Sequence, residues 1–522
     1  MTIPTPNNSK FYLLSLCAIL ATKALLIVGL ILYSGIGLGP DEAQYWTWSN
    51  ALDWGYYSKP PGIAWQIWTG SQFFGNTELG VRFPSIVLGT LLSLAVYFLA
   101  RSCRLQPRTA FWAALIMALC PIGIMGSFLA ITDGGMLLFW VLTFIVITKA
   151  IAELKTPNYF LIGILIAIGA LFKWPIYLIW LLINGFMPFY RFLISPYIIV
   201  GFLISLLGLL PSVEWNYSHD WVTFRHVFTS VIGKQEGVSS VSIFQGNLLE
   251  FWGVQAVLVS PILFAMLLIS FIVLIKNRKT ITPPLFFCGA SCLALLIAGS
   301  LLALFHKVQG NWAVYAYPAG FVFLSACAIE SWKTGKRWVQ IGLVLSLVLS
   351  VFTLSIPYMQ SHNLSRQFPI PYKINPFRHN LGWDRLEQVL NQIGYDPAQH
   401  FLFGDKYQTS SILSFYSPGK KRAYFLNLHG VRLNQFSFWP SMAQEQLAQT
   451  GFFVLTENSP HLEKDLQKNI KFYEEELSKY FHEVHYIGLK PIFESNERLA
   501  KGALIFKCID YNGKEPAKVD LY

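Results

Sequence analysis

Charged residues are scarce in this chain. Asp, Glu, Lys and Arg together make up 13% of its 522 residues, whereas a soluble domain carries about 25%. Hydrophobic residues make up 54%, and the mean hydropathy is +0.46. This composition excludes a disordered chain and an ordinary cytosolic enzyme. It predicts a polytopic membrane protein.

Cysteine is also scarce, and several short catalytic motifs are missing. Of seven cysteines only Cys508 lies beyond residue 356, and there is no CxxC pair or His/Cys cluster. A disulfide framework and a zinc site are therefore excluded. The sequence has no P-loop, no G-x-S-x-G and no D-x-D pair, which argues against nucleotide hydrolysis and against a soluble-type sugar-nucleotide transferase.

Long apolar runs dominate the first 356 residues. A helix needs about 20 apolar residues to cross roughly 30 Å of hydrocarbon. Eleven candidate spans meet or approach this length: 11–38, 83–100, 109–131, 135–150, 158–172, 175–190, 194–213, 251–275, 285–305, 312–329 and 338–356. The sequence therefore predicts a polytopic α-helical membrane domain over 1–356 with about 11 transmembrane helices.

Residues 357–522 have a different pattern, of short strands, helices and turns. Strand-like runs are 400–403, 452–455 and 503–507, and helical runs are 383–393, 406–416 and 462–481. We expect a C-terminal α/β domain. Both a solvated cap without chemistry and a lid that selects the acceptor are open interpretations of it.

The loops between spans carry opposite charge in alternation. One set holds 13 basic residues against two acidic ones, Glu153 and Glu330: Lys10, Arg101, Arg104, Arg108, Lys149, Lys155, Arg191, Lys276, Arg278, Lys279, Lys333, Lys336 and Arg337. The positive-inside rule places this set in the cytoplasm together with the N-terminus. Eleven spans then place the C-terminus outside. The net charge of +11 is mostly this topology signal, so we expect no nucleic-acid partner.

The first outer loop, 39–82, is too long for a simple connector. Asp41 and Glu42 follow the breaker Gly39-Pro40, and Tyr45, Trp46 and Trp48 then recur at helical spacing. We expect a short helix there. For most of these aromatics the favoured interpretation is an ordinary membrane-interface belt. For Asp41-Glu42 the alternative to a functional pair is a solvated helix N-terminus.

Other ionisable side chains lie at the predicted outer ends of spans. They are Lys59 in a Lys-Pro-Pro-Gly turn, Asp133, Lys173, His306 with Lys307, and Arg225 with His226 in the second outer loop, 214–250. Any single one is explained by a snorkelling side chain, but ionisable groups at membrane depth indicate function by default. Lys23 lies in the middle of a span, and we expect it to pair with a carbonyl or an acid.

These residues suit a particular reaction. The outer face carries carboxylates able to act as a base and cations able to hold phosphate. Nucleotide sugars and ATP are not expected outside the cytoplasm, so an activated donor has to arrive in the membrane. A sugar linked to a lipid phosphate meets this need. The alternative is a transporter or flippase for a lipid-linked saccharide, but such a protein should show repeats and charges near the midplane.

An ordered set of motifs resembles a known family. It comprises Asp41-Glu42, Tyr56–Gly62, Gly80–Pro84, Thr132–Gly134, Phe172–Pro175, Glu214–Asn216, His219–Trp221, Gln309–Ala313 with Tyr317-Pro318, Gly404–Gln408 and Arg432–Gln435. Together they resemble the bacterial polyprenyl-phosphate-dependent C-type membrane glycosyltransferases. These are relatives of the protein O-mannosyltransferases and of the lipid A aminoarabinose and galacturonic acid transferases.

The resemblance implies roles for named residues. Asp41 is the expected catalytic base, with Glu42 in support and Asp133 at the catalytic site. The resemblance also implies a donor contact for Lys59. From their positions in the sequence, and not from the resemblance, Lys173, Arg225, His306 and Lys307 are expected to bind the donor phosphate. Tyr57, Arg82 and Asn311 are further expected substrate contacts. No cofactor is expected to be required, although a divalent metal on Asp41 and Asp133 is an alternative. Ser58 stands where the aminoarabinose transferases tend to have Glu, which weakens the case for an amino sugar donor.

The expected function is transfer of one sugar from an undecaprenyl phosphate carrier to an acceptor, with inversion at the anomeric centre. Lipid A or the lipopolysaccharide core is the favoured acceptor, and a protein hydroxyl is second. The expected location is the bacterial inner membrane, with the active site and the C-terminal domain in the periplasm.

Overall fold

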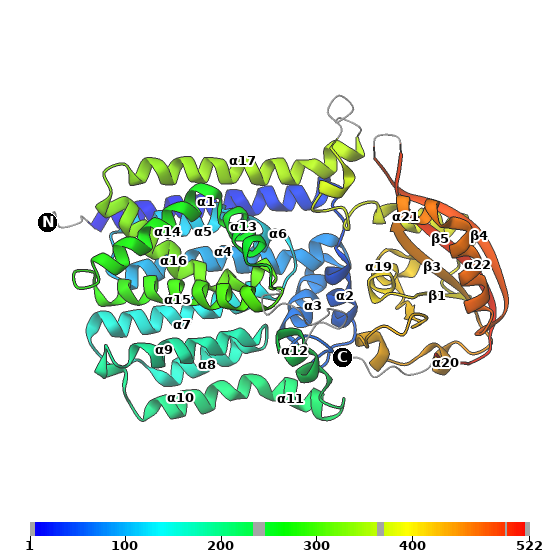
Figure 1. Ribbon diagram of the computed structural model, residues 1–522, viewed down its shortest axis with the longest axis horizontal. Coiled ribbons are helices and arrows are strands. Elements are labelled where there is room, and N and C mark those ends of the chain that lie inside the picture. Colours follow the sequence, from blue (N-terminus) through cyan, green and yellow to red (C-terminus); the bar gives the residue numbers. More distant parts are fainter. Residues whose placement is uncertain (1–5, 233–245, 363–369, 496–497, 517–522) are drawn as a thin grey trace.

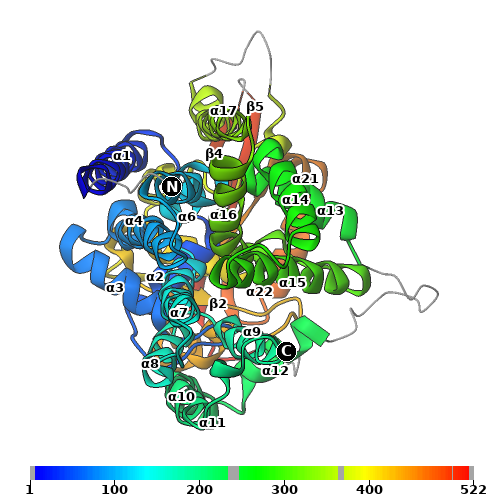
Figure 2. The same cartoon turned by 90° about the vertical axis from the view of Figure 1, so that its left-hand side faces the viewer.

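The computed structural model describes residues 6–232, 246–362, 370–495 and 498–516. A helical bundle and an α/β domain lie end to end along the long axis (Figure 1). The N-terminus lies at the end of the bundle that is remote from the α/β domain (Figure 1). Seen from that end, most of the long helices run roughly parallel (Figure 2).

The helices of the bundle follow the apolar runs of the sequence. Their bounds are α1 Pro6–Tyr33, α2 Pro40–Ser49, α3 Gly62–Phe74, α4 Glu78–Ser102, α5 Pro107–Leu119, α6 Pro121–Phe128, α7 Asp133–Glu153, α8 Tyr159–Ala170, α9 Leu178–Phe186, α10 Tyr197–Leu206, α11 Leu210–Tyr217, α12 Val222–Ile232, α13 Leu248–Val259, α14 Pro261–Lys276, α15 Pro283–Phe305, α16 Tyr317–Ser325 and α17 Gly335–Ser361.

The prediction of a polytopic helical membrane fold is confirmed, but the count of 11 spans is not. Among the described residues, seven helices are long and apolar enough to cross a membrane, or up to nine if each of two bent pairs is one span. Two further predicted spans fall on shorter apolar helices, Tyr159–Ala170 and Trp174–Phe186.

Proline explains both bent pairs. Pro121 follows α5, and the axes of α5 and α6 differ by 59°. Pro261 follows α13, where the chain turns by 108° through Ser260, whose φ is +85°. A proline removes a backbone donor and disfavours a helical conformation at the preceding residue. The prediction for Lys23 is confirmed, since its Nζ donates a hydrogen bond to the carbonyl of Gly123 at 3.1 Å.

The C-terminal domain is a five-stranded mixed sheet with helices around it. Its strands are β1 His400–Gly404, β2 Tyr424–Phe425, β3 Thr450–Asn458, β4 Phe481–Ser495 and β5 Arg498–Tyr511, in the order β2-β1-β3-β5-β4. Its helices are α18 Leu386–Gln392, α19 Tyr407–Tyr416, α20 Met442–Glu445, α21 Ser459–Lys464 and α22 Leu466–Leu477. β1 pairs in parallel with β2 and β3, and β5 is antiparallel to β3 and β4.

The three predicted strands lie in β1, β3 and β5, and the predicted helices lie at α18, α19 and α21–α22. The strands β4 and β2 were not predicted from the sequence. β4 is an edge strand that contains Pro491 and three register shifts, and its residues are only partly buried. A half-exposed edge strand carries a weaker hydrophobic signal than a central strand. β2 has only two residues.

The short helix predicted in the first outer loop is present as α2, but its aromatics do not form a membrane-interface belt. Trp46 and Trp48 are 1% and 0% exposed. The Trp46 ring packs edge-on against Phe415 of α19, with centroids 4.9 Å apart. These side chains fill the seam between bundle and C-terminal domain, because α19 covers α2 in place of lipid head groups.

Candidate functional site

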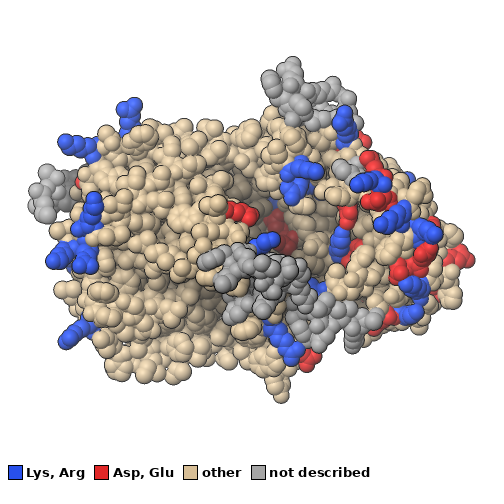
Figure 3. All heavy atoms as spheres, in the orientation of Figure 1, with Lys and Arg blue, Asp and Glu red and all other residues tan. Residues whose placement is uncertain are grey.

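A cavity of about 1670 Å³ lies between the bundle and the C-terminal domain. Figure 3 shows the hollow, with acidic and basic atoms inside it. Basic side chains also gather at the opposite end of the bundle (Figure 3), where the loops with the predicted cytoplasmic charges join the helices. Four carboxylates line the cavity among the described residues: Asp41, Glu42, Asp133 and Glu457.

Asp41 lies in the first turn of α2 and opens into the cavity. The helix begins at Pro40, whose missing N–H and fixed φ suit the first helical position. The enclosing walls raise the pKa of the Asp41 carboxyl above its usual value, with Lys59 and Arg432 opposing that rise and Glu42 adding to it. In the described part of the chain, the Asp41 carboxylate has no ion pair or hydrogen bond that fixes it.

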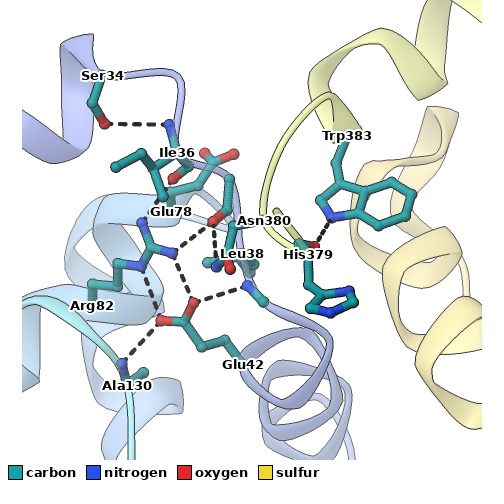
Figure 4. A network of polar contacts seen from close by, with 12 residues as sticks. Ser34, Ile36, Leu38, Glu42, Glu78, Arg82, Ala130, His379, Asn380 and Trp383 are labelled. Atoms are coloured by element: carbon teal, nitrogen blue, oxygen red, sulfur yellow. Dashed lines mark hydrogen bonds and ion pairs between the residues drawn. The ribbon is translucent and has the colours of Figure 1, made fainter. Parts of the chain in front are cut away.

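Glu42 is held inside the protein. Arg82 of α4 donates to both of its carboxylate oxygens, from Nε at 2.9 Å and from Nη2 at 2.7 Å (Figure 4). The backbone N–H groups of Gly39 and Ala130 complete the carboxylate's contacts at 2.9 Å each. The solvated-terminus alternative is therefore wrong for Glu42, which is 4% exposed.

Arg82 does not line the cavity. It is 0% exposed and also donates to the carbonyls of Ile36 and Gly37, at 2.9 and 2.7 Å (Figure 4). Its four hydrogen bonds therefore go to the loop that leads into α2 and to Glu42 in the first turn of that helix. The structure thus replaces the expected substrate contact with a positioning role: Arg82 fixes the start of the helix that carries Asp41.

Lys59 lies on a tight turn that the two following prolines stiffen. The turn is closed by backbone hydrogen bonds between Tyr56 and Lys59, at 3.1 and 3.4 Å. Lys59 lines the cavity, and burial together with the charge of Lys173 lowers its pKa, against the effect of Asp41. Tyr57 also lines the cavity, and its N–H donates to Gln435 of the C-terminal domain at 2.7 Å.

Asp133 and Lys173 form an ion pair of 2.7 Å in the cavity wall. Asn311 is also in the wall, with its amide nitrogen 3.4 Å from Asp133. No group of three or more His, Cys, Asp or Glu side chains suited to a metal occurs among the described residues. Lys59 interacts electrostatically with both Asp41 and Asp133. Of the two expected metal ligands, Asp133 is thus paired with Lys173, whereas Asp41 has no ion-pair partner among the described residues.

Three of the expected phosphate ligands do not line the cavity. Arg225 on α12 and both His306 and Lys307 after α15 are exposed, and none of them belongs to the cavity wall. Part of the second outer loop, 233–245, lies outside the described residues. The ionisable residues at the predicted outer ends of spans thus form two groups. One group lines the cavity together with Asp41, and the other group, Arg225, His306 and Lys307, does not.

The C-terminal domain supplies a cation that the list of expected ligands omitted. Arg432 lines the cavity, interacts electrostatically with Asp41 and Lys59, and hydrogen-bonds Tyr407. Its Nη1 lies 3.2 Å from Nδ1 of His226. Burial and the charges of Arg432 and Lys59 lower the pKa of His226 to about 4, so this ring is neutral near pH 7. The only signal in the sequence was the Arg432–Gln435 motif.

Comparisons with known proteins agree with this architecture. Residues 58–215 match the family described as dolichyl-phosphate-mannose-protein mannosyltransferase. Over 319 residues the chain is 27% identical to the lipid A galacturonosyltransferase RgtD of Rhizobium johnstonii, which covers 59% of this chain and 63% of the relative. Over 91 residues it is 36% identical to the undecaprenyl phosphate-alpha-4-amino-4-deoxy-L-arabinose arabinosyl transferase of Pseudomonas aeruginosa, covering 15% of this chain and 17% of that one.

Solved structures share the whole fold. ArnT from Cupriavidus metallidurans, bound to undecaprenyl phosphate, superposes with a TM-score of 0.57 at 12% identity, over 94% of this chain and 97% of that chain. The chain thus shares its fold with this solved structure. The predicted resemblance to the bacterial polyprenyl-phosphate-dependent C-type membrane glycosyltransferases is confirmed. Within the class, the chain is similar to proteins named as lipid A sugar transferases.

Proposed function

We propose that the protein transfers one sugar from a polyprenyl phosphate to an acceptor, with Asp41 as the general base. One observation carries this proposal. Of the four cavity carboxylates among the described residues, Glu42 is paired with Arg82, Asp133 with Lys173 and Glu457 with Lys406. Asp41 alone of these four has no fixed partner. Its raised pKa makes it a stronger base than an ordinary carboxylate.

The reaction proceeds by a single displacement. An acceptor hydroxyl oxygen attacks the anomeric carbon while its proton passes to the Asp41 carboxylate. The bond from that carbon to the phosphate oxygen breaks on the opposite face, and its electron pair leaves with the polyprenyl phosphate. Lys59 and Arg432 stabilise the departing charge. The product has the inverted configuration, and Asp41 then releases its proton to water.

The donor lipid fits the apolar part of the cavity. Its apolar lining includes Met125, Leu129, Val257, Leu258 and Leu349. α6, α13 and α17, which carry these residues or adjoin them, belong to the bundle. A prenyl chain in this part of the cavity would bring its phosphate to Lys59. The solved structure of the similar protein from Cupriavidus metallidurans contains undecaprenyl phosphate.

Lipid A or the lipopolysaccharide core is the proposed acceptor. The relatives that match here are named lipid A galacturonosyltransferase and arabinosyl transferase. A uronic acid is the favoured sugar, because cations outnumber unpaired acids in the cavity and Ser58 replaces an acid that would attract an amino sugar. A protein hydroxyl is the second candidate acceptor, because the family matched over residues 58–215 is described as a protein mannosyltransferase.

The proposed orientation places the cavity in the periplasm of a bacterium. The basic loops lie at the end of the bundle that also carries the N-terminus, remote from the C-terminal domain (Figures 1 and 3). The positive-inside rule assigns that end to the cytoplasm. The cavity and the C-terminal domain then face the opposite side of the inner membrane.

Mass spectrometry of lipid A, core and glycoproteins tests the proposal. Cells that contain the wild-type chain should carry a sugar-sized mass that cells with Asp41→Asn lack. Asp220→Asn is a matched control, because Asp220 is exposed and does not line the cavity. An identical mass profile for wild type and Asp41→Asn, with both proteins in the membrane, would contradict the assignment and favour a transporter of lipid-linked saccharides.

A further inference from the structure

The cavity wall formed by the C-terminal domain contains a buried lysine that the proposed reaction does not use. Lys501 lies near the start of β5, lines the cavity and is only 3% exposed. Its Nζ donates to the carbonyl of Leu381 at 2.8 Å and lies 3.9 Å from the centre of the Trp383 ring. No carboxylate within the described part of the chain forms an ion pair with it.

A buried ammonium group without a counter-ion is costly. An anion bound in the cavity would offset this cost. The Leu381 carbonyl accepts from one of the three N–H groups of the Nζ, and the Trp383 ring covers a second side of it. The remaining side is available to a ligand.

The neighbours of Lys501 are further hydrogen-bonding groups and carry no negative charge. Asn458 faces it across the pairing of β3 with β5 and also lines the cavity. His379 lines the same wall, next to Trp383, whose indole N–H donates to the His379 carbonyl at 2.7 Å (Figure 4). Burial lowers the pKa of Lys501 to about 7, and burial with the charges of Arg378 and Lys501 lowers that of His379.

This wall is separate from the reacting centre but lies beside it. The charges that act on Asp41 are those of Lys59, Glu42 and Arg432, and Lys501 is not among them. Asn380, next to His379, donates to the carbonyl of Gly37 at 3.1 Å, just before the helix that carries Asp41. Lys501 and Asp41 line the same cavity, so one ligand can contact both.

We propose that Lys501, Asn458 and His379 form a subsite for a phosphate monoester on the saccharide head group of the acceptor. A phosphate offers three terminal oxygens to donors that come from different directions, which suits an ammonium, an amide and an imidazole. Lys501 belongs to the sheet domain beyond the bundle, so a head group reaches it and a membrane-embedded lipid chain does not. Naming the ligand as the acceptor rests on the proposed function.

Binding of lipid A to the full-length protein tests the subsite without any sugar donor. Native mass spectrometry would compare phosphorylated lipid A, the same lipid A after phosphatase treatment, and inorganic phosphate as a competitor. We expect wild type to bind the phosphorylated form about tenfold or more tightly, because a charge-assisted hydrogen bond contributes on this scale. Lys501→Met should reduce this preference about tenfold, whereas Lys501→Arg should keep most of it. Lys468→Met on the exposed face of α22 is the matched control and should keep all of it.

Clear outcomes would overturn the subsite. Equal binding of the two lipid A forms by the wild-type protein would exclude an acceptor phosphate as the ligand. If inorganic phosphate competes in that case, free phosphate is the ligand. An undiminished preference in Lys501→Met excludes Lys501. If Lys501→Met is not recovered folded, Asn458→Ala, which leaves the lysine intact, should still reduce the preference. Because the assay involves no transfer, its failure and a failure of the proposed glycosyltransferase activity are read separately.

Discussion

The two walls of the cavity differ in how their charges are compensated. In the bundle wall, Glu42 and Asp133 each have a basic partner at 2.7 Å. In the wall of the C-terminal domain, Arg432 contacts His226 and Tyr407, and Lys501 contacts a carbonyl and an aromatic ring. In the bundle wall, Asp41 and Lys59 therefore have no described ion-pair partner. In the opposite wall, Glu457 pairs with Lys406, and no described carboxylate forms an ion pair with Arg432 or Lys501.

In the proposed reaction the two regions have separate tasks. The bundle supplies a rigid frame and the proposed base, whose carboxylate has no described ion-pair partner. The C-terminal domain supplies cations suited to anionic parts of the substrates. Its residues form one wall of the cavity, and its role as a lid that selects the acceptor stays a prediction.

Removing the base should have the largest effect. We expect Asp41→Asn to lower the rate of sugar transfer by about 10²–10⁴-fold, the usual contribution of a positioned general base. Its thermal stability should stay close to that of wild type, because the carboxylate holds no described partner. Transfer from a defined polyprenyl-phosphate donor, measured in purified protein, checks this. Substantial activity of Asp41→Asn would show that Asp41 is not the catalytic base.

Breaking the buried pair should affect stability before chemistry. Arg82→Met leaves the Glu42 carboxylate buried without its partner, and such a loss costs about 3–5 kcal/mol. The melting temperature in detergent should fall clearly below that of wild type. Arg385→Met, on an exposed residue of the C-terminal domain, should melt like wild type. A normal melting temperature with a loss of substrate binding would instead restore Arg82 as a substrate contact.

Arg432 tests the contribution of the opposite wall. Arg432→Gln should reduce transfer by about 10- to 100-fold, the scale of one charge-assisted hydrogen bond to the leaving phosphate. Arg432→Lys should retain more activity, because a positive charge remains. Arg385→Gln serves as the control, since that residue does not line the cavity. Equal activity of Arg432→Gln and wild type would show that Arg432 does not contribute to transfer.

The pH dependence of kcat/KM tests the electrostatic interaction between Asp41 and Arg432, which lie in opposite walls of the cavity. Asp41 has to be ionised, so transfer is present above its pKa and is lost as the pH falls through it. Because this pKa is raised, the acid limb should lie above the ordinary value of about 4. Arg432 lowers the pKa of Asp41, so Arg432→Gln should move the limb to higher pH. A limb that stays in place would show that the two residues do not interact.

The seam between the regions should give the smallest effect. The Tyr416 hydroxyl accepts from the Leu38 N–H at 2.7 Å and donates to Glu78 at 2.9 Å, which ties α19 to the start of the bundle. Tyr416→Phe should cost about 1 kcal/mol, as for a typical hydrogen bond. Hydrogen exchange should increase along residues 34–39. Tyr511→Phe, which removes a hydroxyl hydrogen bond to the Lys514 carbonyl beside a separate core cluster, should leave that exchange unchanged.

The sequence by itself determined the elements whose signal is local. Apolar runs defined the membrane helices, Gly39-Pro40 defined the start of α2, and three of the five strands were recognisable from buried runs. Six residues that the sequence motifs singled out line one cavity: Asp41, Lys59, Asp133, Lys173, Tyr57 and Asn311. These residues lie at the predicted outer ends of neighbouring spans, where a bundle topology alone places them close together.

Only the tertiary structure decided which charges are paired and which are free. Arg82 and Glu42 are 40 positions apart, and Arg432 lies almost 400 positions from Asp41, so no local periodicity links them. Their roles depend on burial and on the position of a second domain, since a buried ion pair fixes a helix whereas a cation facing a cavity can bind substrate. For the same reason the α2 aromatics, which resemble an interface belt in sequence, lie in the core of a domain seam.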